Sequence, residues 1–428
     1  MISVEEAFQH ILAHTIPVSV ESVPLSEAAG RILREDITAD RDLPPFDRVT
    51  MDGIAVRYEA FAAGQRRFRI NGMQLAGQPP RTLADPAACL EAMTGAVLPF
   101  GTDTIIRYED LTLTDGWATV NLDVVTPGQN VHRRASDRPQ GDRLIGAGTR
   151  LNPVHIAVAA SVGKGQVLVS ARPRIALIST GDELVDVDET PLPHQIRRSN
   201  TYLLKAVLDA AGAQTTLLHL PDEEAVMEEN LSHWLTQFDA LVLSGGVSAG
   251  KADFVPRVLE RLGVRAVFHQ VAQRPGKPLW FGCGWMPGWM PSLRAMASIQ
   301  ASIHIQTPPP LPTPATPALP VFGLPGNPVS TFLCACRYLL PWLSASLGEI
   351  RKPPSVARLM APVAFKPSLT YFLPVGLTVD AEGVWLAEPF PGGGSGDYAN
   401  LLRCDGFLEL PADRSEFAAD EAFPVWTW

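Results

Sequence analysis

The stretch from Leu241 to Asp253 constrains the fold more than any other part of this chain. It begins with an apolar run, continues through Gly245, Gly246 and Gly250, and leads into a helical pattern over residues 254–262. A buried strand, a glycine-rich loop and a helix together present backbone N–H groups to an anion at the carboxyl edge of an α/β sheet. Ordinary tight turns share this composition, so the stretch predicts the fold class without naming a ligand.

Polar, Gly- or Pro-rich segments also follow other predicted strands. Strand 174–179 runs into Thr180-Gly181-Asp182, strand 215–220 ends near Asp222, and strand 265–271 precedes Arg274-Pro-Gly-Lys277. The strands alternate with helices at 201–211 and 223–236, a pattern that predicts a parallel sheet with right-handed crossovers. Because the carboxyl ends of parallel strands share one edge, we expect these segments to form a single site there.

Length, charge and cysteine usage narrow the possible functions. A chain of 428 residues is too long for one core and predicts several domains. Its formal net charge of −10 argues against a nucleic-acid partner. The five cysteines form no CxxC pair, which favours buried structural roles. The sequence shows neither a signal peptide nor an uninterrupted membrane span, so we expect a cytoplasmic location without membrane association.

The remaining patterns divide the chain into domains. A capping box at Ser3–Glu6 opens an N-terminal helix, and further helices are expected at 24–33 and 151–162. The expected parts are an elongated helical linker domain (1–40 and 138–172, discontinuous), a small β domain (41–137), an α/β domain (173–350) and a C-terminal β-barrel (351–428). Residues 281–320 are rich in Pro and Trp and show neither helical nor strand periodicity, so we interpret them as a flexible surface insertion.

Seven motifs, in their order and spacing, resemble one family. They are Asp42–Val56, Thr94–Pro99, Arg133–Asp137, Ser179–Leu184, Ser244–Asp253, Arg274–Pro278 and Leu324–Ser330. The chain resembles the molybdopterin molybdenumtransferases of the MoeA type, which are related to the gephyrin E domain. The resemblance covers nearly the whole chain apart from 281–320. The combination of STGDEL, SGGVS and LPGNPVS is highly specific, although each alone is not.

The resemblance implies a reaction, an assembly and a set of partners. Members insert molybdate into adenylylated molybdopterin, release AMP and require Mg²⁺. They are homodimers whose active site lies between the α/β domain of one subunit and the small β domain of the other. The expected partners are the molybdopterin adenylyltransferase that makes the substrate and the enzymes that receive the molybdenum cofactor. A multidomain α/β fold with a molybdopterin-binding α/β domain follows from the same resemblance.

Matching the motifs position by position assigns roles to individual residues. Arg274 and Lys277 suit the phosphates of the substrate, and carboxylates suit Mg²⁺, which prefers oxygen ligands. The residues expected to be catalytic, with Arg133 and Arg134 as molybdate contacts, are Asp52, Thr94, Glu109, Arg133, Arg134 and Asp137. The expected metal ligands are Asp182, Asp222 and Asp253. The expected substrate-binding residues are Ser179, Thr180, Gly181, Ser244, Gly245, Gly246, Ser248, Arg274, Lys277, Pro325, Gly326, Asn327, Pro328 and Ser330.

The chain departs from the family pattern at several of these motifs. The departures are Arg48-Val49-Thr50, Ile54, Ala135-Ser136, Arg198, Lys251 and Gln270. Arg198 and Lys251 stand where acidic residues are common, which changes the charge near an anionic ligand. Two alternatives to the enzyme therefore stay open: a non-catalytic carrier of molybdopterin or finished cofactor, and a scaffold that uses the 281–320 segment. The choice between molybdate and tungstate is also open.

Overall fold

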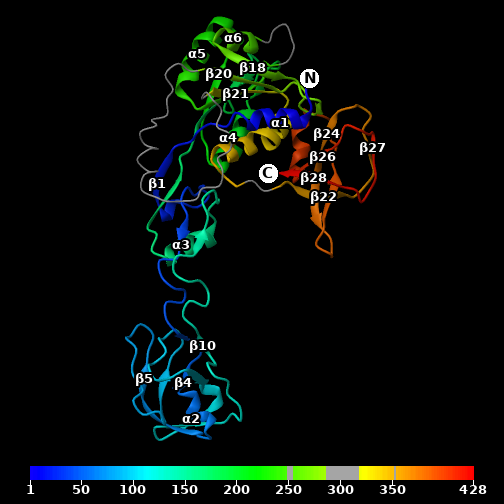
Figure 1. Cartoon of the computed structure of the whole chain (residues 1–428). Coiled ribbons are helices and arrows are strands. Elements are labelled where there is room, and N and C mark those ends of the chain that lie inside the picture. The colour runs from blue at the N-terminus through cyan, green and yellow to red at the C-terminus, as the bar shows by residue number, and fades with distance from the viewer. Residues whose placement is uncertain (248–253, 286–317, 351–352) are drawn as a thin grey trace.

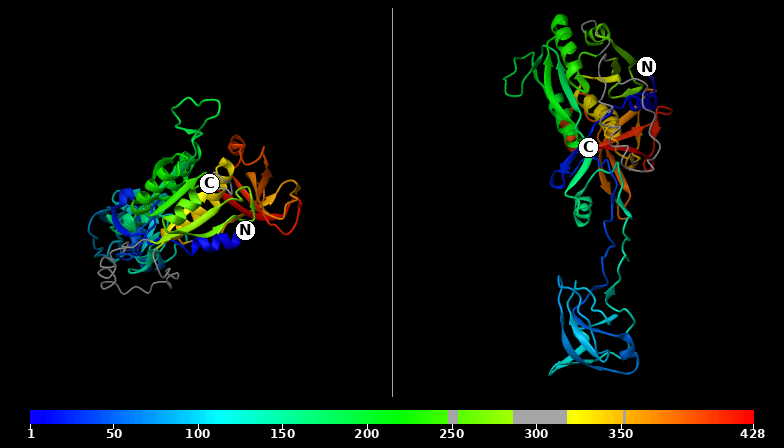
Figure 2. Two further views of the ribbon diagram at one scale, coloured as in Figure 1. Left: turned by 90° about the horizontal axis from the view of Figure 1, so that it is seen from above. Right: turned by 60° about the vertical axis from the view of Figure 1, so that its left-hand side comes forward.

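The computed structural model describes residues 1–247, 254–285, 318–350 and 353–428 of the chain. An α/β domain and a C-terminal β-barrel lie side by side, and a small β domain lies at the far end of a narrow connection that the chain passes through twice (Figure 1). The right-hand view of Figure 2 shows the same separation. The multidomain α/β architecture expected from the sequence is confirmed.

A six-stranded sheet in the order β16-β13-β17-β21-β20-β18 forms the centre of the α/β domain. Five strands run in one direction, whereas β20 is antiparallel to both of its neighbours. The strands predicted from the sequence are therefore parallel to one another, as expected, and β20 is an additional antiparallel strand that was not predicted. The strands are β13 (Arg174–Thr180), β16 (Gln214–Leu220), β17 (Ala240–Ser244), β18 (Val264–His269), β20 (Trp280–Trp285) and β21 (Ala318–Leu324).

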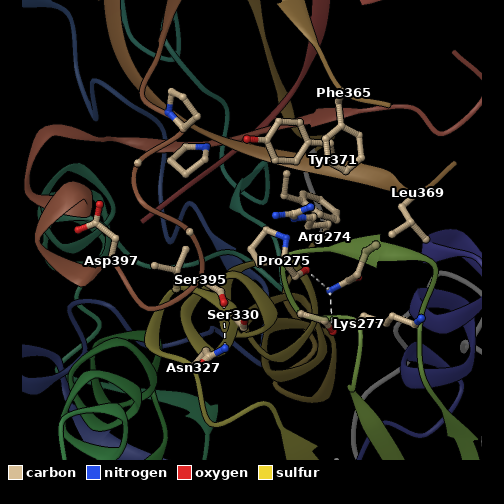
Figure 3. Close-up of a pocket in the computed structure, with 18 of the residues that line it drawn as sticks. Arg274, Pro275, Lys277, Asn327, Ser330, Phe365, Leu369, Tyr371, Ser395 and Asp397 are labelled. Atoms are coloured by element: carbon tan, nitrogen blue, oxygen red, sulfur yellow. Dashed lines mark hydrogen bonds between the residues drawn. The ribbon is translucent and has the colours of Figure 1, made fainter. Parts of the chain in front are cut away.

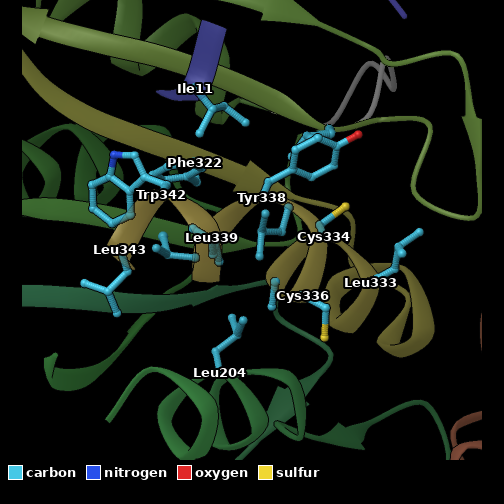
Figure 4. Close-up of a cluster of buried hydrophobic side chains, with 14 of the residues drawn as sticks. Ile11, Leu204, Phe322, Leu333, Cys334, Cys336, Tyr338, Leu339, Trp342 and Leu343 are labelled. Carbon is cyan, nitrogen blue, oxygen red and sulfur yellow. The ribbon is translucent and has the colours of Figure 1, made fainter. Parts of the chain in front are cut away.

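Helices cover both faces of this sheet. Ile175 and Leu177 of β13 pack with α4, α8 and α9, whereas Ala176 and Ile178 pack with α5 and α6 on the other face. Figure 4 shows Leu204 of α4 on the first face, opposite side chains of the last helical segment. The alternation explains why β13 reads as a continuous apolar run. The helices are α4 (Asn200–Ala211), α5 (Glu224–Gln237), α6 (Val255–Arg261), α8 (Pro328–Cys334) and α9 (Leu340–Ser346), with a π-helical turn, η3 (Ala335–Leu339), between the last two.

The N-terminal helix α1 (Val4–Leu12) belongs to the α/β domain in space. Ser3 and Glu6 form the predicted capping box, and Phe8 and Ile11 are buried in the same core as α4 and α9. The amphipathic pattern of α1 required a surface to bury its apolar face, and the α/β core supplies it. The assignment of residues 1–40 to the linker is corrected on this point.

The connection between the domains contains more strand than helix, contrary to expectation. Two antiparallel pairs run along it, β1 (Val20–Pro24) with β12 (Gln166–Ser170) and β2 (Ile37–Thr38) with β11 (Arg143–Ile145). The helix expected at 24–33 is only the 3-10 turn η1 (Leu25–Glu27), and the later helix is α3 (Pro153–Ser161). Aliphatic side chains, among them Val167 and Val169, form a separate hydrophobic core within this connection.

The small β domain is a six-stranded sheet in the order β7-β4-β6-β5-β9-β8, as its short β runs predicted. Residues of β4, including Ile54 and Val56, pack with Phe68 and Ile106 on one face. Its elements are β3 (Arg48–Val49), β4 (Gly53–Val56), α2 (Tyr58–Ala62), β5 (Arg67–Gln74), β6 (Ala88–Ala92), β7 (Thr104–Arg107), η2 (Tyr108–Asp110), β8 (Leu111–Thr114), β9 (Trp117–Val120) and β10 (Val131–His132).

The segment interpreted as an insertion is shorter than the sequence indicated. Residues 281–285 belong to β20 and residues 318–320 belong to β21, and these strands pair from Trp280↔Gly323 to Trp285↔Ala318. Frequent Gly and Pro residues hid the strands, because both residue types are uncommon inside strands. The rest of that segment, 286–317, lies outside the described residues.

The C-terminal barrel closes because β24 pairs with both β25 and β26. A short strand of the α/β domain, β19 (Gln273–Arg274), adds to it alongside Thr370 and Tyr371 of β24. This pairing joins the two domains directly beside the candidate site. The barrel elements are β22 (Ser355–Leu359), β23 (Val363–Ala364), β24 (Thr370–Val379), β25 (Trp385–Pro389), η4 (Tyr398–Arg403), β26 (Gly406–Leu410), β27 (Glu416–Phe417) and β28 (Ala422–Thr427). None of the helices in the described ranges combines the length and apolarity needed to cross a bilayer.

Candidate functional site

A cavity of about 290 Å³ opens where β13, β17 and β21 end, and we call it the strand-end cavity. Its walls are residues 179–180, 183–184, 196–201, 244–245 and 326–328. The sequence therefore predicted correctly that these strand ends converge. Ser179, Thr180, Ser244, Gly326 and Asn327 are brought together from three separate strands.

Several polar atoms in this cavity lack partners. Thr180 Oγ1, Asn200 Oδ1 and Arg198 Nε are buried without a hydrogen-bond partner among the described residues, and they are three of the four such side-chain atoms found there. Asn200 is nevertheless held firmly, since its Nδ2 donates to Ser244 Oγ (2.9 Å) and to the Gly326 carbonyl (2.7 Å). Buried polar groups are nearly always paired in folded proteins. The concentration of unpaired atoms indicates a site for a polar ligand.

The glycine loop after β17 is required for close packing. Gly245 and Gly246 have φ values of +99° and +66°, which favour glycine. A Cβ added to Gly245 would lie 2.8 Å from Thr180 Oγ1 and 3.0 Å from the Thr180 carbonyl oxygen. The loop therefore packs so closely against the end of β13 that a side chain at residue 245 would clash with Thr180. Ser248, which the sequence placed in the site, lies outside the described residues.

Arg198, one of the expected departures from the family pattern, places a guanidinium group in the wall of the strand-end cavity. Its guanidinium forms an ion pair with Asp186, and Asp186 also accepts a hydrogen bond from the Tyr202 hydroxyl (3.1 Å). The Arg198 side chain is only 18% exposed. This departure therefore changes the cavity wall itself.

His219 lies behind the cavity wall, and the sequence reasoning missed it. It lies on β16, and its Nδ1 is 3.0 Å from the Ser179 hydroxyl. Burial, followed by the nearby Arg198 charge, lowers the pKa of His219, which keeps the imidazole neutral at pH 7. The only available signal was its position one residue before the end of a predicted strand.

Asp182 and Asp222 lie next to each other at the ends of β13 and β16. The Asp222 backbone N–H donates to Asp182 Oδ1 (3.0 Å), so both carboxylates belong to the same edge of the sheet. Asp253, the third predicted metal ligand, lies outside the described residues. Within the described ranges, no group of three or more His, Cys, Asp or Glu side chains is arranged to hold a metal ion.

A larger cavity of about 590 Å³ lies between the α/β domain and the barrel, and we call it the interdomain cavity. Figure 3 shows Arg274, Lys277 and Ser330 on one wall and the barrel residues Phe365 and Tyr371 on the opposite wall. The two aromatic rings are stacked, with centroids 4.2 Å apart. The sequence had indicated only the glycine-rich loop 392–397 of this wall, as a flexible loop that could cap a site. The barrel wall comprises residues 364–367, 369, 371–372, 374, 391–395, 397 and 400–401.

Asn327 lines both cavities and links them. Its Nδ2 donates to Ser395 Oγ (2.9 Å) in the glycine-rich loop of the barrel, and the Val329 N–H donates to the Ser395 carbonyl (3.1 Å). The loop expected to cap a site therefore contacts the LPGNPVS motif. Pro325 borders the larger cavity and Pro328 the smaller one, so this motif separates the two spaces.

The predicted residues of the small β domain lie apart from both cavities and are held by local polar contacts. Asp52 Oδ1 accepts hydrogen bonds from Thr94 Oγ1 (2.6 Å) and from the Thr94 N–H (2.7 Å), and these bonds lower the pKa of Asp52. Asp137 lies 2.8 Å from His132 Nε2, and Glu109 is exposed on η2. These residues lie in the small β domain, far from the strand ends within one chain (Figure 1).

Arg133 and Arg134 are both engaged by carboxylates. Arg133 Nη1 donates to Asp47 (2.7 Å), and Arg134 Nε donates to Asp42 (2.6 Å). Their side chains are still 50% and 66% exposed. They are thus orientated by neighbours while remaining open to an anion.

Comparisons with known proteins agree with this arrangement along the whole chain. A model described as the MoeA N-terminal region (domain I and II) matches residues 2–163. A model described as a probable molybdopterin binding domain matches residues 176–345, and one described as the MoeA C-terminal region (domain IV) matches residues 356–428.

Individual relatives are similar over most or all of their length. A molybdopterin molybdenumtransferase from Synechocystis sp. is 37% identical over 430 residues, covering 100% of both chains. One from Synechococcus elongatus is 35% identical and covers 82% of both chains. The crystal structure of the molybdopterin biosynthesis MoeA protein from Pyrococcus horikoshii superposes with a TM-score of 0.77 at 30% identity, covering 100% of this chain and 99% of that one. With its domains in the same order and its strand-end cavity formed by the shared motifs, the chain belongs to the MoeA family.

Proposed function

We propose that this protein is a molybdopterin molybdenumtransferase that inserts molybdate into adenylylated molybdopterin and releases AMP. The observation that carries the proposal is the group of buried polar atoms at Thr180, Arg198 and Asn200 at the sheet edge, which have no hydrogen-bond partner within the described part of the chain. A substrate with several polar groups would satisfy these atoms. A relative that matches the full length of the chain is named molybdopterin molybdenumtransferase.

The two linked cavities fit a long anionic substrate. Arg274 and Lys277 are exposed at the interdomain cavity, where they can bind phosphate oxygens by charge-assisted hydrogen bonds. The Phe365–Tyr371 stack faces them and offers an apolar wall for a flat ring. Asn327, at the junction, would contact the middle of the substrate.

The residues at the sheet edge also fit Mg²⁺. This ion is usually bound by one or two carboxylates together with substrate phosphates and water. Asp182 and Asp222 supply two adjacent carboxylates, with Asp253 as the third candidate from the sequence. When bound, Mg²⁺ would neutralise the charge of the substrate phosphates. His219, kept neutral by burial, would leave that negative charge to the metal and to Arg198.

We also propose that the active protein is a homodimer. Asp52, Thr94, Glu109, Arg133, Arg134 and Asp137 lie too far from the strand-end cavity to act on a ligand within the same chain. The small β domain of a second copy would bring them to it, because a twofold dimer presents each site with the partner's surface.

The cellular context follows from the chemistry. The substrate must come from an adenylyltransferase that activates molybdopterin, and the product must pass to molybdenum enzymes. We place these steps in the cytoplasm. The five cysteines are all free, and four of them are buried, which suits a reducing compartment.

Reconstitution tests the proposal directly. Purified protein is mixed with adenylylated molybdopterin, Mg²⁺ and micromolar molybdate, and AMP release is followed together with active cofactor. We expect AMP release that depends on molybdate, and a parallel assay with tungstate measures the preference between the two oxyanions. Tight binding of the substrate without AMP release would instead support the carrier alternative. Unchanged turnover after deletion of residues 286–317 would argue against a catalytic role for that segment.

A further inference from the structure

The Gln273 side chain is fully buried directly before the basic loop of the interdomain cavity. Its Nε2 donates to the carbonyls of Pro275 (3.2 Å) and Gly276 (3.3 Å). These two carbonyls lie between Arg274 and Lys277 in the chain, so one amide group fixes the backbone that separates the two cations. Figure 3 shows both cations on this loop.

Tyr338 holds the other end of the same amide. Its hydroxyl donates to Gln273 Oε1 (2.5 Å), and its side chain is fully buried on the π-helical turn η3. Burial raises the pKa of Tyr338, so the phenol stays protonated and remains a donor. Figure 4 shows Tyr338 pointing out of the helical segment beside Cys334. Single π-helical turns inside helices are often found at functional sites.

The loop has little freedom around this contact. A Cβ at Gly276 would lie 2.6 Å from Gln273 Nε2, so the amide occupies the space that any larger residue would need. The Val271 N–H donates to the Lys277 carbonyl (2.9 Å), which closes the loop at its base. Outside this network, the Arg274 and Lys277 side chains are exposed, so their positions depend on the backbone that carries them.

We propose that Gln273 and Tyr338 are positioning residues that set the spacing of Arg274 and Lys277 for the phosphates of the substrate. The proposal rests on the proposed function and deepens it. Both side chains are fully buried, so we expect them to act behind the two cations and not on the substrate itself. Each acts through the carbonyls of the loop, in the way that buried neighbours commonly fix the residues that bind a ligand.

Two substitutions remove the network in graded steps. Gln273→Met keeps the volume of the side chain and loses all its hydrogen bonds, and we expect about a tenfold rise in KM for adenylylated molybdopterin with a smaller change in kcat. Tyr338→Phe loses only the hydroxyl, and we expect about a threefold rise. The same ratios should appear in the Kd for AMP, which serves as a probe that needs no turnover.

Gln74→Met is a matched control. Gln74 is also fully buried, and its Nε2 donates to the carbonyls of Leu75 (3.2 Å), Gln78 (3.4 Å) and Pro79 (3.3 Å) in a proline-containing loop of the small β domain. Both glutamine variants should lower the thermal midpoint by a similar amount. Only Gln273→Met should change KM and the Kd for AMP.

A double-mutant cycle separates positioning from general destabilisation. In a Lys277→Ala background the cation is gone, so Gln273→Met should weaken binding of AMP by less than it does in the wild type. Additive effects, or a KM for Gln273→Met within twofold of wild type, would overturn the proposal. Wild-type protein that neither turned over nor bound AMP would remove the proposed function, and this inference with it.

Discussion

The polar groups of the strand-end cavity and those of the small β domain differ in their burial and in their hydrogen bonding. In the cavity, Thr180, Arg198 and Asn200 each keep a buried atom that has no hydrogen-bond partner among the residues that the structure describes. In the small β domain, Asp52 is bound by Thr94, and Arg133 by Asp47, on an exposed surface. Unpaired buried atoms cost free energy until a ligand satisfies them, whereas paired surface groups cost almost nothing.

The difference teaches how the work of the site is divided. In the α/β domain, buried polar atoms lower the stability of the protein until a ligand binds to them. In the small β domain, the polar side chains are already orientated by their neighbours. Side chains that are preorganised in this way can act on a ligand that is bound by a different domain. In the proposed homodimer, each chain would therefore contribute two half-sites, one from each of these domains.

The largest effect should come from mixing two inactive variants. Asp52→Asn disables the small β domain, Lys277→Ala disables the α/β domain, and we expect each to lower kcat/KM on the order of 100-fold. In a 1:1 mixture that exchanges subunits, half of the dimers are mixed and each has one intact site, so activity should recover to about a quarter of wild type. AMP release before and after mixing measures this.

The controls for mixing are each variant mixed with itself, which should stay inactive. A double variant, Asp52→Asn with Lys277→Ala in one chain, mixed with wild type should give no gain above dilution. Failure of the two single variants to complement each other, despite proven subunit exchange, would mean that both half-sites act within one chain.

Arg198→Ala should have the next largest effect. It removes one of the two arginines that line the strand-end cavity. We expect KM for adenylylated molybdopterin to rise about tenfold, because charge-assisted hydrogen bonds are the strong ones. Arg261→Ala is the matched control, since Arg261 pairs with Glu224 and Glu228 on the helical surface of the same domain. Equal effects of the two variants would show that Arg198 serves only its ion pair with Asp186.

Gly245→Ala and Gly116→Ala compare a glycine that packs closely against Thr180 with a glycine in an open turn. Gly245 has φ +99° and Thr180 atoms at 2.8 Å and 3.0 Å from the added Cβ, whereas Gly116 of the β8–β9 turn has φ +77° and nothing within 4 Å. We expect Gly245→Ala to lower the thermal midpoint by about 5 °C and Gly116→Ala by about 2 °C. Similar shifts for the two variants would mean that the backbone angle, and not the contact, sets the cost.

Sequence patterns identified the parts of the fold that are determined by residues close together in the chain. The apolar run of β17, the capping box of α1 and the polar strand ends were all readable, because each depends on neighbouring residues. The antiparallel strand β20 was missed because Gly282 and Gly284 mask its periodicity. The 3-10 turn at Leu25–Glu27 was read as a helix because its residues favour helices without supplying a core to pack on.

The candidate site was only partly predictable for a physical reason. Motifs report strand ends, but they do not report which distant domain covers them. The barrel wall with Phe365 and Tyr371, and the contact of His219 with Ser179, depend on residues far apart in the sequence. Gln273 likewise became informative only when its amide was seen to bond the carbonyls of Pro275 and Gly276.

The smallest expected effect is a difference in pH response between the two half-sites. Burial and the Arg198 charge lower the pKa of His219 below its ordinary 6.5, although Asp182 and Asp222 oppose the shift. Below about pH 6.5 the unfolded chain therefore binds a proton that the folded protein does not, so stability falls as pH drops through that value.

Asp52 behaves differently, because Thr94 lowers its pKa below the ordinary 3.8, and its contribution is lost only as pH falls below that value. Thermal midpoints measured between pH 8 and pH 5 should decline in wild type and in Asp52→Asn, and should decline less in His219→Gln. An identical decline in all three proteins would show that the folded protein does not keep His219 neutral. The proposed difference between the strand-end cavity and the small β domain would then have no support from pH dependence.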